Sequence, residues 1–438
     1  MTAAVDLVSF DGTEACTAAV ATPDRYRELR ERLAEPGPHT IRGAGLSYAL
    51  ASAATGATAV STRYFDRILA HDPDRGQVTV EPGLTVGALL RFAVARGLHV
   101  PVLPGHPSIT VGGCAGFNVH GKSQHDVGLF SDHVVGLTLL HPDHGELTCS
   151  ATGNAELFEL TLGGMGLTGY IASLTLQLPA LPGRAVRRTV VPVDDLVEAV
   201  DVMTARRDTG EALYSWNDLN TRGRGFGRGM VFAESFVDGE RPSRTAYRRL
   251  EPGRRGRGRP AGFRLVVAAV NLGYRTRERL RPGDVRSVED AAFPINGSEV
   301  YYRLFGRQGF REYQLVVPTE AWADAVPEIA RAVQAADVPV TLGSLKLFAG
   351  KPRLLWFRCD GVCLALDAPE GEATRGLFSR LDDLAVEYGC VVNLSKDSRV
   401  GADTVRAVYP GYDEFRRRLH EFDPHRRFDS MLRRRIDV

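Results

Sequence analysis

Hydrophobic and polar residues alternate with two different periods along the first part of the chain. Hydrophobic side chains recur every three or four residues at 26–34, which predicts a helix, and every second residue at 77–80, which predicts a strand. Residues 134–140 and 146–148 predict a strand pair around a Pro-Asp-His-Gly turn, and residues 170–178 predict another strand. Short strands and short helices therefore alternate here.

After the Pro-Ala-Leu-Pro-Gly stretch at 179–183 the chain becomes richer in arginine and its candidate strands and helices become longer, so this stretch predicts a domain boundary. Residues 322–336 and 374–388 have the pattern of amphipathic helices, and each follows a strand-like run. Such repeats predict a sheet with helices on one face. Residues 248–264 instead hold seven arginines among glycines and prolines, which predicts a mobile loop or, alternatively, a patch for anionic lipid or phosphate.

Size and charge exclude some classes of function. A chain of 438 residues favours two domains, and 54 basic against 53 acidic residues give no electrostatic reason for a nucleic-acid partner. No hydrophobic run approaches the ~20 residues of a membrane-spanning helix, and residues 1–15 lack the basic start of a secretory signal. We therefore expect a cytoplasmic protein, with peripheral membrane contact left open.

The cysteines form no recognisable metal or redox motif. No Cys-x-x-Cys pair and no His/Cys cluster with zinc spacing occurs, so we expect no metal and reduced thiols. The six are Cys16, Cys114, Cys149, Cys359, Cys363 and Cys390.

Three glycine-rich segments carry the candidate chemistry. They span residues 42–48, 104–128 and 163–169, each beside a strand signal. Residues 105–128 have little periodicity, which predicts irregular backbone. Glycine lets backbone approach a ligand closely, and successive N–H groups can bind an anion. Each segment alone could be a plain turn, but together they favour one long phosphorylated ligand. Spacing does not distinguish FAD from other such ligands.

These segments resemble the FAD domain of the vanillyl-alcohol oxidase and p-cresol methylhydroxylase family. The resemblance rests on the first glycine segment, on Val111-Gly112-Gly113 with His120-Gly121-Lys122, and on residues 163–169 followed by Ile171. Further motifs, Lys346-Leu347-Phe348, Lys396-Asp397-Ser398-Arg399 and Tyr409-Pro410, resemble the branch that oxidises decaprenylphosphoryl ribose. The likeness runs from about residue 41 to the C-terminus and is weakest at 184–306.

The resemblance implies an α+β fold with three parts. Residues 1–183 would form a two-part FAD-binding domain of the p-cresol methylhydroxylase type. Residues 184–391 would form a substrate-binding cap domain with an antiparallel sheet and helices on one face. Residues 392–438 would return to the FAD domain.

The same likeness implies which residues contact FAD. They are Arg42, Gly43, Ala44, Gly45, Leu46, Ser47, Gly105, Thr110, Gly112, Gly113, Asn118, His120, Gly121, Gly166, Gly169 and Ile171. Many family members attach FAD through a histidine where this chain has Leu46, which has no nucleophilic atom. We therefore predict non-covalent FAD. A thioether to Cys114 is the alternative, although a small buried role suits that residue better.

Candidate catalytic residues also follow from the resemblance: Lys396, His120, Tyr48, Gln314 and Lys346. Lys396 would lie beside the flavin and the substrate hydroxyl, where its charge would stabilise the reduced cofactor or its desolvated amine would act as a base. The alternative is a surface lysine paired with Asp397.

A second group is expected to line the substrate pocket: Lys122, Cys363 and Asn393. His120 could relay a proton, but histidines are more often structural. Cys363 has apolar neighbours that favour a packing role, and Asn393 replaces an aromatic residue of the related branch.

The resulting hypothesis is an FAD enzyme that oxidises a secondary hydroxyl of a sugar-like substrate to a ketone by hydride transfer to flavin N5. This reaction can be half of an epimerisation completed by a partner reductase. We favour a soluble sugar, nucleoside or aminocyclitol of specialised metabolism, because no apolar lipid-docking stretch stands out. The alternatives are a polyprenylphosphoryl-ribose 2-oxidase of cell-wall arabinan precursor synthesis, a nicotinamide-linked flavin reductase and a binding protein without redox chemistry.

Overall fold

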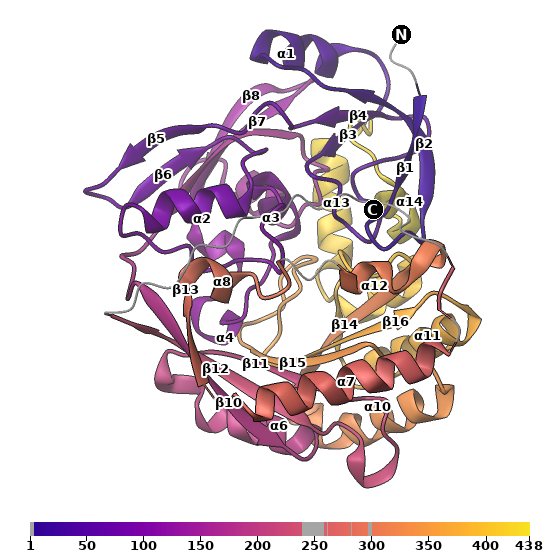
Figure 1. The fold of residues 1–438 in the computed structure, drawn as a ribbon. Coiled ribbons are helices and arrows are strands. Elements are labelled where there is room, and N and C mark those ends of the chain that lie inside the picture. The colour runs from indigo at the N-terminus through magenta and orange to yellow at the C-terminus, as the bar shows by residue number, and fades with distance from the viewer. Residues whose placement is uncertain (1–3, 239–257, 261, 282, 297–299) are drawn as a thin grey trace.

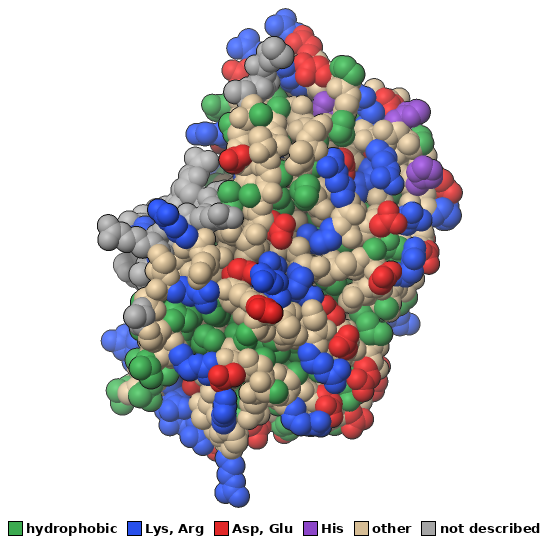
Figure 2. Space-filling model, turned by 90° about the vertical axis from the view of Figure 1, so that its right-hand side faces the viewer, with side chains coloured by type: hydrophobic (Ala, Val, Ile, Leu, Met, Phe, Trp, Pro, Cys, Tyr) green, Lys and Arg blue, Asp and Glu red, His purple; other side chains and the backbone are tan. Residues whose placement is uncertain are grey.

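The computed structural model describes residues 4–238, 258–260, 262–281, 283–296 and 300–438. Two sheets come from the chain before residue 178 and two from the chain after residue 184, with helices packed around them (Figure 1). The expected α+β class is confirmed. On the face shown in Figure 2, basic and acidic side chains are interspersed, in keeping with a net charge of +1.

The first two sheets differ in strand direction. One has the order β1-β2-β4-β3, in which β4 pairs in parallel with β2 and β3, and the other is antiparallel with the order β5-β6-β9-β7-β8. The elements of this part are β1 (Ala4–Val8), β2 (Ala15–Ala21), α1 (Tyr26–Ala34), β3 (His39–Arg42), β4 (Thr58–Ser61), β5 (Ile68–Asp72), β6 (Gln77–Val80), α2 (Val86–Val94), α3 (Val111–Phe117), α4 (Gln124–Val127), β7 (Val134–His141), β8 (Gly145–Ser150), α5 (Ala155–Thr161) and β9 (Tyr170–Gln177).

Most sequence predictions for this part are confirmed, and one is wrong. The helix at 26–34 and the strand pair around 142–145 form as expected. Residues 105–128 were expected to be irregular, yet they contain α3 and α4. The hydroxyl of Thr110 caps α3 by accepting from the amide of Gly113, and Val111 and Cys114 are fully buried. Packing therefore overrides the poor helix propensity of its glycines.

The sheets of the second pair are both antiparallel, and they adjoin at their edge strands β11 and β15. Their orders are β11-β12-β10-β13 and β15-β16-β14-β17, and the amide of Leu345 on β15 donates to the hydroxyl of Ser215 on β11 at 2.9 Å. The elements are β10 (Ala185–Val193), α6 (Leu196–Ala205), β11 (Ala212–Asn217), β12 (Gly229–Val237), α7 (Phe263–Arg279), β13 (Gly283–Ser287), α8 (Val288–Ala292), α9 (Val300–Arg303), β14 (Phe310–Pro318), α10 (Trp322–Ala336), β15 (Leu342–Phe348), β16 (Gly361–Pro369), α11 (Glu372–Glu387) and β17 (Val391–Val392).

Alternation along these strands separates a packed face from an open one. Leu345 and Leu315 join the core that α6, α10 and α11 cover, whereas Ser344 and Gln314, one residue away, line a cavity. The helix expected at 322–336 is confirmed as α10.

The C-terminal segment returns to the first sheet. It contains α12 (Ala402–Val408), α13 (Tyr412–Phe422) and α14 (Met431–Ile436), of which α13 and α14 are drawn in yellow beside β1–β4 in Figure 1. The amide of His39 donates to Arg427, and the amide of Asp429 donates to His39, both at 2.8 Å. Through these bonds the two ends of the chain stabilise each other.

Helix α7 buries polar side chains and exposes apolar ones, the reverse of an ordinary surface helix. Its buried residues include Asn271, which donates to Asp218, and Glu278, which pairs with Arg188 at 2.7 Å. Leu265 and Leu272 lie outward and are 75% and 55% exposed. The loop expected at 248–264 falls largely on residues 248–257 and 261, which lie outside the described residues, and Arg264 belongs to α7. No described helix is both long and apolar enough to cross a bilayer.

Candidate active site

One continuous cavity of about 1160 Å³ lies between the glycine segments and the open face of the second pair of sheets. Residues from all three glycine segments line it, together with residues from β11, β12, β14, β15, α7 and the segment after β17. Its size suits an extended cofactor with a substrate beside it.

The three glycine segments contact one another at this cavity. A β-carbon on Gly43 would lie 2.4 Å from the hydroxyl of Thr110, so the first and second segments meet there. The amide of Met165 donates to the carbonyl of Gly116 at 2.7 Å, which joins the second and third segments. Backbone from three distant parts of the sequence therefore forms one wall, which we call the glycine wall (residues 43–48, 105–121 and 166–171).

Every predicted FAD contact except Arg42 lines the cavity. Arg42 is tucked behind the loop, where its guanidinium donates to the hydroxyl of Ser52 at 2.9 Å. Gly45 has a φ of +71°, a left-handed conformation that favours glycine, and a β-carbon there would also lie 2.4 Å from that guanidinium. Arg42 therefore supports the loop from behind.

The glycine wall fits a bound FAD. It offers backbone amides and small residues along a length of cavity, as a diphosphate and a flat ring require. Leu46 lines this wall at the position of the family's attachment histidine, and Cys114 does not line it. Cys114 is fully buried, and burial raises the pKa of its thiol, which disfavours a reactive thiolate.

The opposite wall is the open face of β14, β15 and β16, which we call the sheet wall. The strand register places three rows across it, namely Leu342–Asp367–Glu312, Ser344–Ala365–Gln314 and Lys346–Cys363–Val316. All of the first two rows and Lys346 line the cavity. Cys363, the register partner of Lys346, does not line the cavity, because it is buried among apolar side chains; Ala365 lines it in the neighbouring row.

Lys396 reaches the cavity from the segment after β17. Its ammonium donates to a carboxylate oxygen of Glu312 at 3.1 Å and lies 4.1 Å from the ring centre of Tyr48. Asp397 pairs instead with Arg399 at 2.9 Å. The surface pairing considered as an alternative for Lys396 is therefore wrong.

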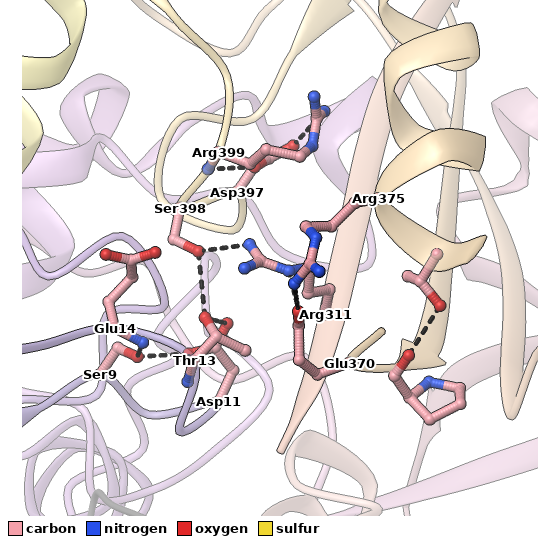
Figure 3. Close-up of polar contacts among 12 residues, drawn as sticks. Ser9, Asp11, Thr13, Glu14, Arg311, Glu370, Arg375, Asp397, Ser398 and Arg399 are labelled. Carbon is pink, nitrogen blue, oxygen red and sulfur yellow. Dashed lines mark hydrogen bonds and ion pairs between the residues drawn. The ribbon is translucent and has the colours of Figure 1, made fainter. Parts of the chain in front are cut away.

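A polar network holds Asp397, Ser398 and Arg399, the three residues after Lys396, in place (Figure 3). The hydroxyl of Ser398 accepts from Arg311 on β14 at 2.8 Å and contacts the hydroxyl of Thr13 at 3.1 Å. Arg399 pairs with Asp397 and with Asp382 of α11. These contacts fix the backbone on which Lys396 stands, and so direct its side chain into the cavity.

Gln314 connects two predicted site residues with Glu312. Its carbonyl oxygen accepts from the amide of Asn393 at 2.7 Å and lies 3.4 Å from Nε2 of His120, while its amide donates to Glu312. Burial, helped by the charge of Lys346, lowers the pKa of His120 to about 3. His120 is therefore neutral near pH 7 and can donate from only one ring nitrogen.

Two lysines occupy the cavity differently. Lys122 donates to Glu234 at 2.8 Å and to the carbonyl of Ala291 at 2.6 Å, and burial lowers its pKa. Lys346 has no hydrogen-bond or ion-pair partner in the part of the chain that the structure describes. Burial lowers the pKa of Lys346 too. Because its amino group has no partner among the described residues, it is available to an anionic or hydrogen-bonding ligand.

Sequence reasoning missed Glu312 and Asp367. Glu312 stands two residues before Gln314, so the strand period that places Gln314 on the open face places Glu312 there as well. Asp367 ends a hydrophobic run on β16, where only the strand register shows which face it occupies.

Comparisons with known proteins define the class. Residues 17–150 match the model of an FAD binding domain. The chain is an FAD-dependent enzyme and belongs to the p-cresol methylhydroxylase-type FAD oxidoreductases.

Three known proteins show which enzymes this chain is similar to. The chain is 29% identical over 446 aligned positions to the decaprenylphosphoryl-beta-D-ribose oxidase of Mycolicibacterium smegmatis, covering 97% of this chain and 95% of that one. It is 30% identical over 379 positions to an uncharacterized protein in the mprA 5′ region of Streptomyces coelicolor, covering 81% of this chain and all of that one. A shorter match, 34% over 113 positions, is to mouse L-gulonolactone oxidase, covering 26% of this chain and 25% of that one.

Proposed function

We propose that this enzyme oxidises a secondary hydroxyl of a soluble sugar-like substrate to a ketone. The observation that carries the proposal is the single cavity in which a backbone wall suited to FAD faces a wall of hydroxyl-binding side chains. Carboxylate, amide and ammonium groups on the sheet wall are the partners that a polyol requires. We also propose that residues 1–183, 184–391 and 392–438 are the units of the fold.

Each residue has a distinct part in this proposal. Bound FAD supplies the acceptor for a hydride. Gln314 and Lys346 hold substrate hydroxyls in register, so that the reacting C–H bond is presented in a fixed orientation. Lys396 keeps a positive charge beside the reacting centre and stabilises negative charge that develops there. His120, neutral at pH 7, contributes a hydrogen bond rather than a charge.

Anaerobic bleaching of the flavin spectrum tests the function. The holoenzyme is mixed without oxygen with D-ribose, myo-inositol, uridine or ribose 5-phosphate, and then with NADH. Bleaching by a polyol supports the proposal. Bleaching by NADH alone contradicts it and favours the flavin reductase.

The cofactor is proposed to be held without a covalent bond, because Leu46 has no nucleophilic atom. After acid precipitation, FAD should remain in the supernatant and the pellet should be colourless. Yellow colour in the washed pellet would contradict this assignment.

One observation favours the alternative substrate, a polyprenylphosphoryl ribose. Leu265, Leu272 and Arg279 are spaced by seven residues and share the outer face of α7, whose inner side lines the cavity. Hydrophobic side chains among basic ones suit the surface of an anionic membrane. In Figure 2, hydrophobic and basic side chains project together at the left-hand edge, which corresponds to the front of Figure 1, where α7 runs.

Vesicle sedimentation separates the two substrates. If the substrate is lipid-linked, the holoenzyme should sediment with vesicles of phosphatidylglycerol and phosphatidylcholine, and Leu272→Glu should reduce the bound fraction. Val386→Glu is the matched control, because Val386 is 48% exposed on α11, away from the cavity. Absence of sedimentation supports the soluble substrate.

A further inference from the structure

Two carboxyl groups lie side by side at one end of the sheet wall. Glu312 on β14 and Asp367 on β16 are directly paired in the strand register, and both line the cavity. They are 6% and 2% exposed. Two buried carboxylates this close repel each other, so such a pair is stable only when cations, donors or a retained proton compensate for it.

Glu312 is surrounded by donors. One of its oxygens accepts from the ammonium of Lys396 at 3.1 Å, and the other accepts from the side-chain amide of Gln314. Burial and the charge of this carboxyl group raise the pKa of the Tyr48 hydroxyl, which therefore stays protonated. An ionised carboxylate only accepts hydrogen bonds, so an arrangement with one donor on each oxygen fits a carboxylate at Glu312.

Asp367 has a different environment. One oxygen accepts from the hydroxyl of Tyr301 at 2.6 Å, and the other is buried without a hydrogen-bond partner in the described part of the chain. Burial, reinforced by the charge of Glu312, raises the pKa of Asp367 well above its usual range. A protonated Asp367 turns the unpartnered oxygen into a donor beside Glu312, which removes both the repulsion and the unmet acceptor.

Building on the proposed function, we propose that Glu312 accepts the proton of the substrate hydroxyl and that Asp367 holds the second proton of the carboxyl pair. The substrate C–H bond breaks with its electron pair leaving as hydride to oxidised FAD. The O–H bond breaks, its electron pair forms the second bond of the ketone, and its proton goes to a Glu312 oxygen. The carboxyl pair then holds two protons instead of one.

The other candidates suit this role less well. Lys396 is already an ammonium paired with Glu312. His120, with a pKa of about 3, releases a proton too readily to retain one at neutral pH. Lys346 has a lowered pKa and no partner among the described residues, so it is the rival acceptor, and it lies two rows away across the sheet wall.

Several groups would shape the pH dependence of this pair. Lys396 faces it from the segment after β17, and Tyr48 from the loop after β3. Tyr301 of α9 contacts Asp367, and its hydroxyl also contacts Thr341 before β15. Lys346 of β15 and Cys363 of β16 act at longer range. Titration therefore belongs to the pair and its surroundings rather than to one carboxyl group.

Infrared difference spectroscopy tests Asp367 in the oxidised enzyme before substrate is added, and Glu312 after reduction by substrate. The holoenzyme at pH 7 is reduced in the absence of oxygen by a polyol that bleaches the flavin, and the carbonyl bands of protonated carboxyl groups are compared before and after. The oxidised wild type should show a protonated carboxyl band that Asp367→Asn lacks. Reduction should add a second band that Glu312→Gln lacks. Asp11→Asn is the control, because Asp11 is another buried carboxyl group outside the cavity.

Kinetics with any polyol that bleaches the flavin give the second readout. Glu312→Gln should slow reduction by about 10²–10⁴-fold and remove its pH dependence, with substrate affinity changed only a few-fold. Asp367→Asn should shift the pH dependence. The proposal is overturned if Glu312→Gln leaves the reduction band in place, or if Lys346→Met rather than Glu312→Gln removes the pH dependence. Failure of every polyol, with the Asp367 band of the oxidised enzyme intact, would instead contradict only the proposed function.

Discussion

The two walls of the cavity are built in different ways. The glycine wall uses backbone, and at Gly43 the nearest side-chain oxygen would lie 2.4 Å from an added β-carbon. The sheet wall uses charged and polar side chains at alternate strand positions, among them Glu312, Lys346 and Asp367. The glycine wall therefore tolerates few residue types at its positions, whereas the sheet wall can accommodate many.

This difference separates cofactor binding from substrate choice. A side chain added to the glycine wall fills space that the cofactor or a neighbouring loop requires. A side chain changed on the sheet wall alters charge and hydrogen bonding, while the strand beneath it keeps its backbone bonds. We expect substitutions on the glycine wall to abolish FAD binding. Substitutions on the sheet wall should leave FAD bound and change the rate or specificity of the reaction.

The largest expected effect is loss of the cofactor in Gly43→Val. The valine side chain would press on the hydroxyl of Thr110, which caps α3, and would separate the first and second glycine segments. The purified variant should have far less FAD per protein than the wild type, as measured by its flavin absorbance, while circular dichroism remains unchanged.

The matched control for Gly43→Val is Gly376→Ala. Gly376 lies in α11 with open space around its would-be β-carbon, so FAD content should be unchanged. Full retention of FAD in Gly43→Val would show that the glycine wall tolerates side chains and would remove the distinction between the walls.

Lys396→Ala should have the next largest effect. The variant keeps the glycine wall intact and so should remain yellow. Loss of the ammonium beside the reacting centre should slow anaerobic flavin reduction by about 10²–10³-fold. Stopped-flow absorbance with a bleaching polyol measures the rate.

Lys396→Arg keeps the positive charge and should recover part of that rate. Equal rates in the wild type and Lys396→Ala would show that the charge of Lys396 has no part in the reaction.

The same contrast explains what the sequence could predict. Glycine loops leave a readable motif because few residues fit them, and the FAD contacts inferred from that motif line the cavity, Arg42 excepted. Glu312 leaves no motif, since a glutamate in a strand resembles any half-buried polar residue. Its importance appears only when folding brings Lys396 and Asp367 against it.

Helices α7 and α10 show a similar limit. Helix α10 turns its apolar side to the core, so its hydrophobic period predicted it. Helix α7 turns Asn271 and Glu278 inward, where Asp218 and Arg188 satisfy them, and leaves Leu265 and Leu272 outside. The rule that the apolar face of a helix points inward fails here, because residues distant in the sequence supply buried partners for the polar face.

The smallest predicted effect concerns the contacts near the join of the two walls, where Asp11 lies beside Arg311 and Ser398 (Figure 3). Burial raises the pKa of Asp11 to about 6, against 3.8 as a reference for the unfolded chain. Because the folded state binds this proton more tightly, the stability that it contributes is full below pH 4 and is lost as the pH rises through 6. The loss amounts to about 3 kcal/mol. Asp11→Asn should flatten the dependence of unfolding free energy on pH between 4 and 6, as measured by urea denaturation, and should leave FAD content unchanged. An unaltered slope would mean that Asp11 is ionised in the folded protein throughout this range.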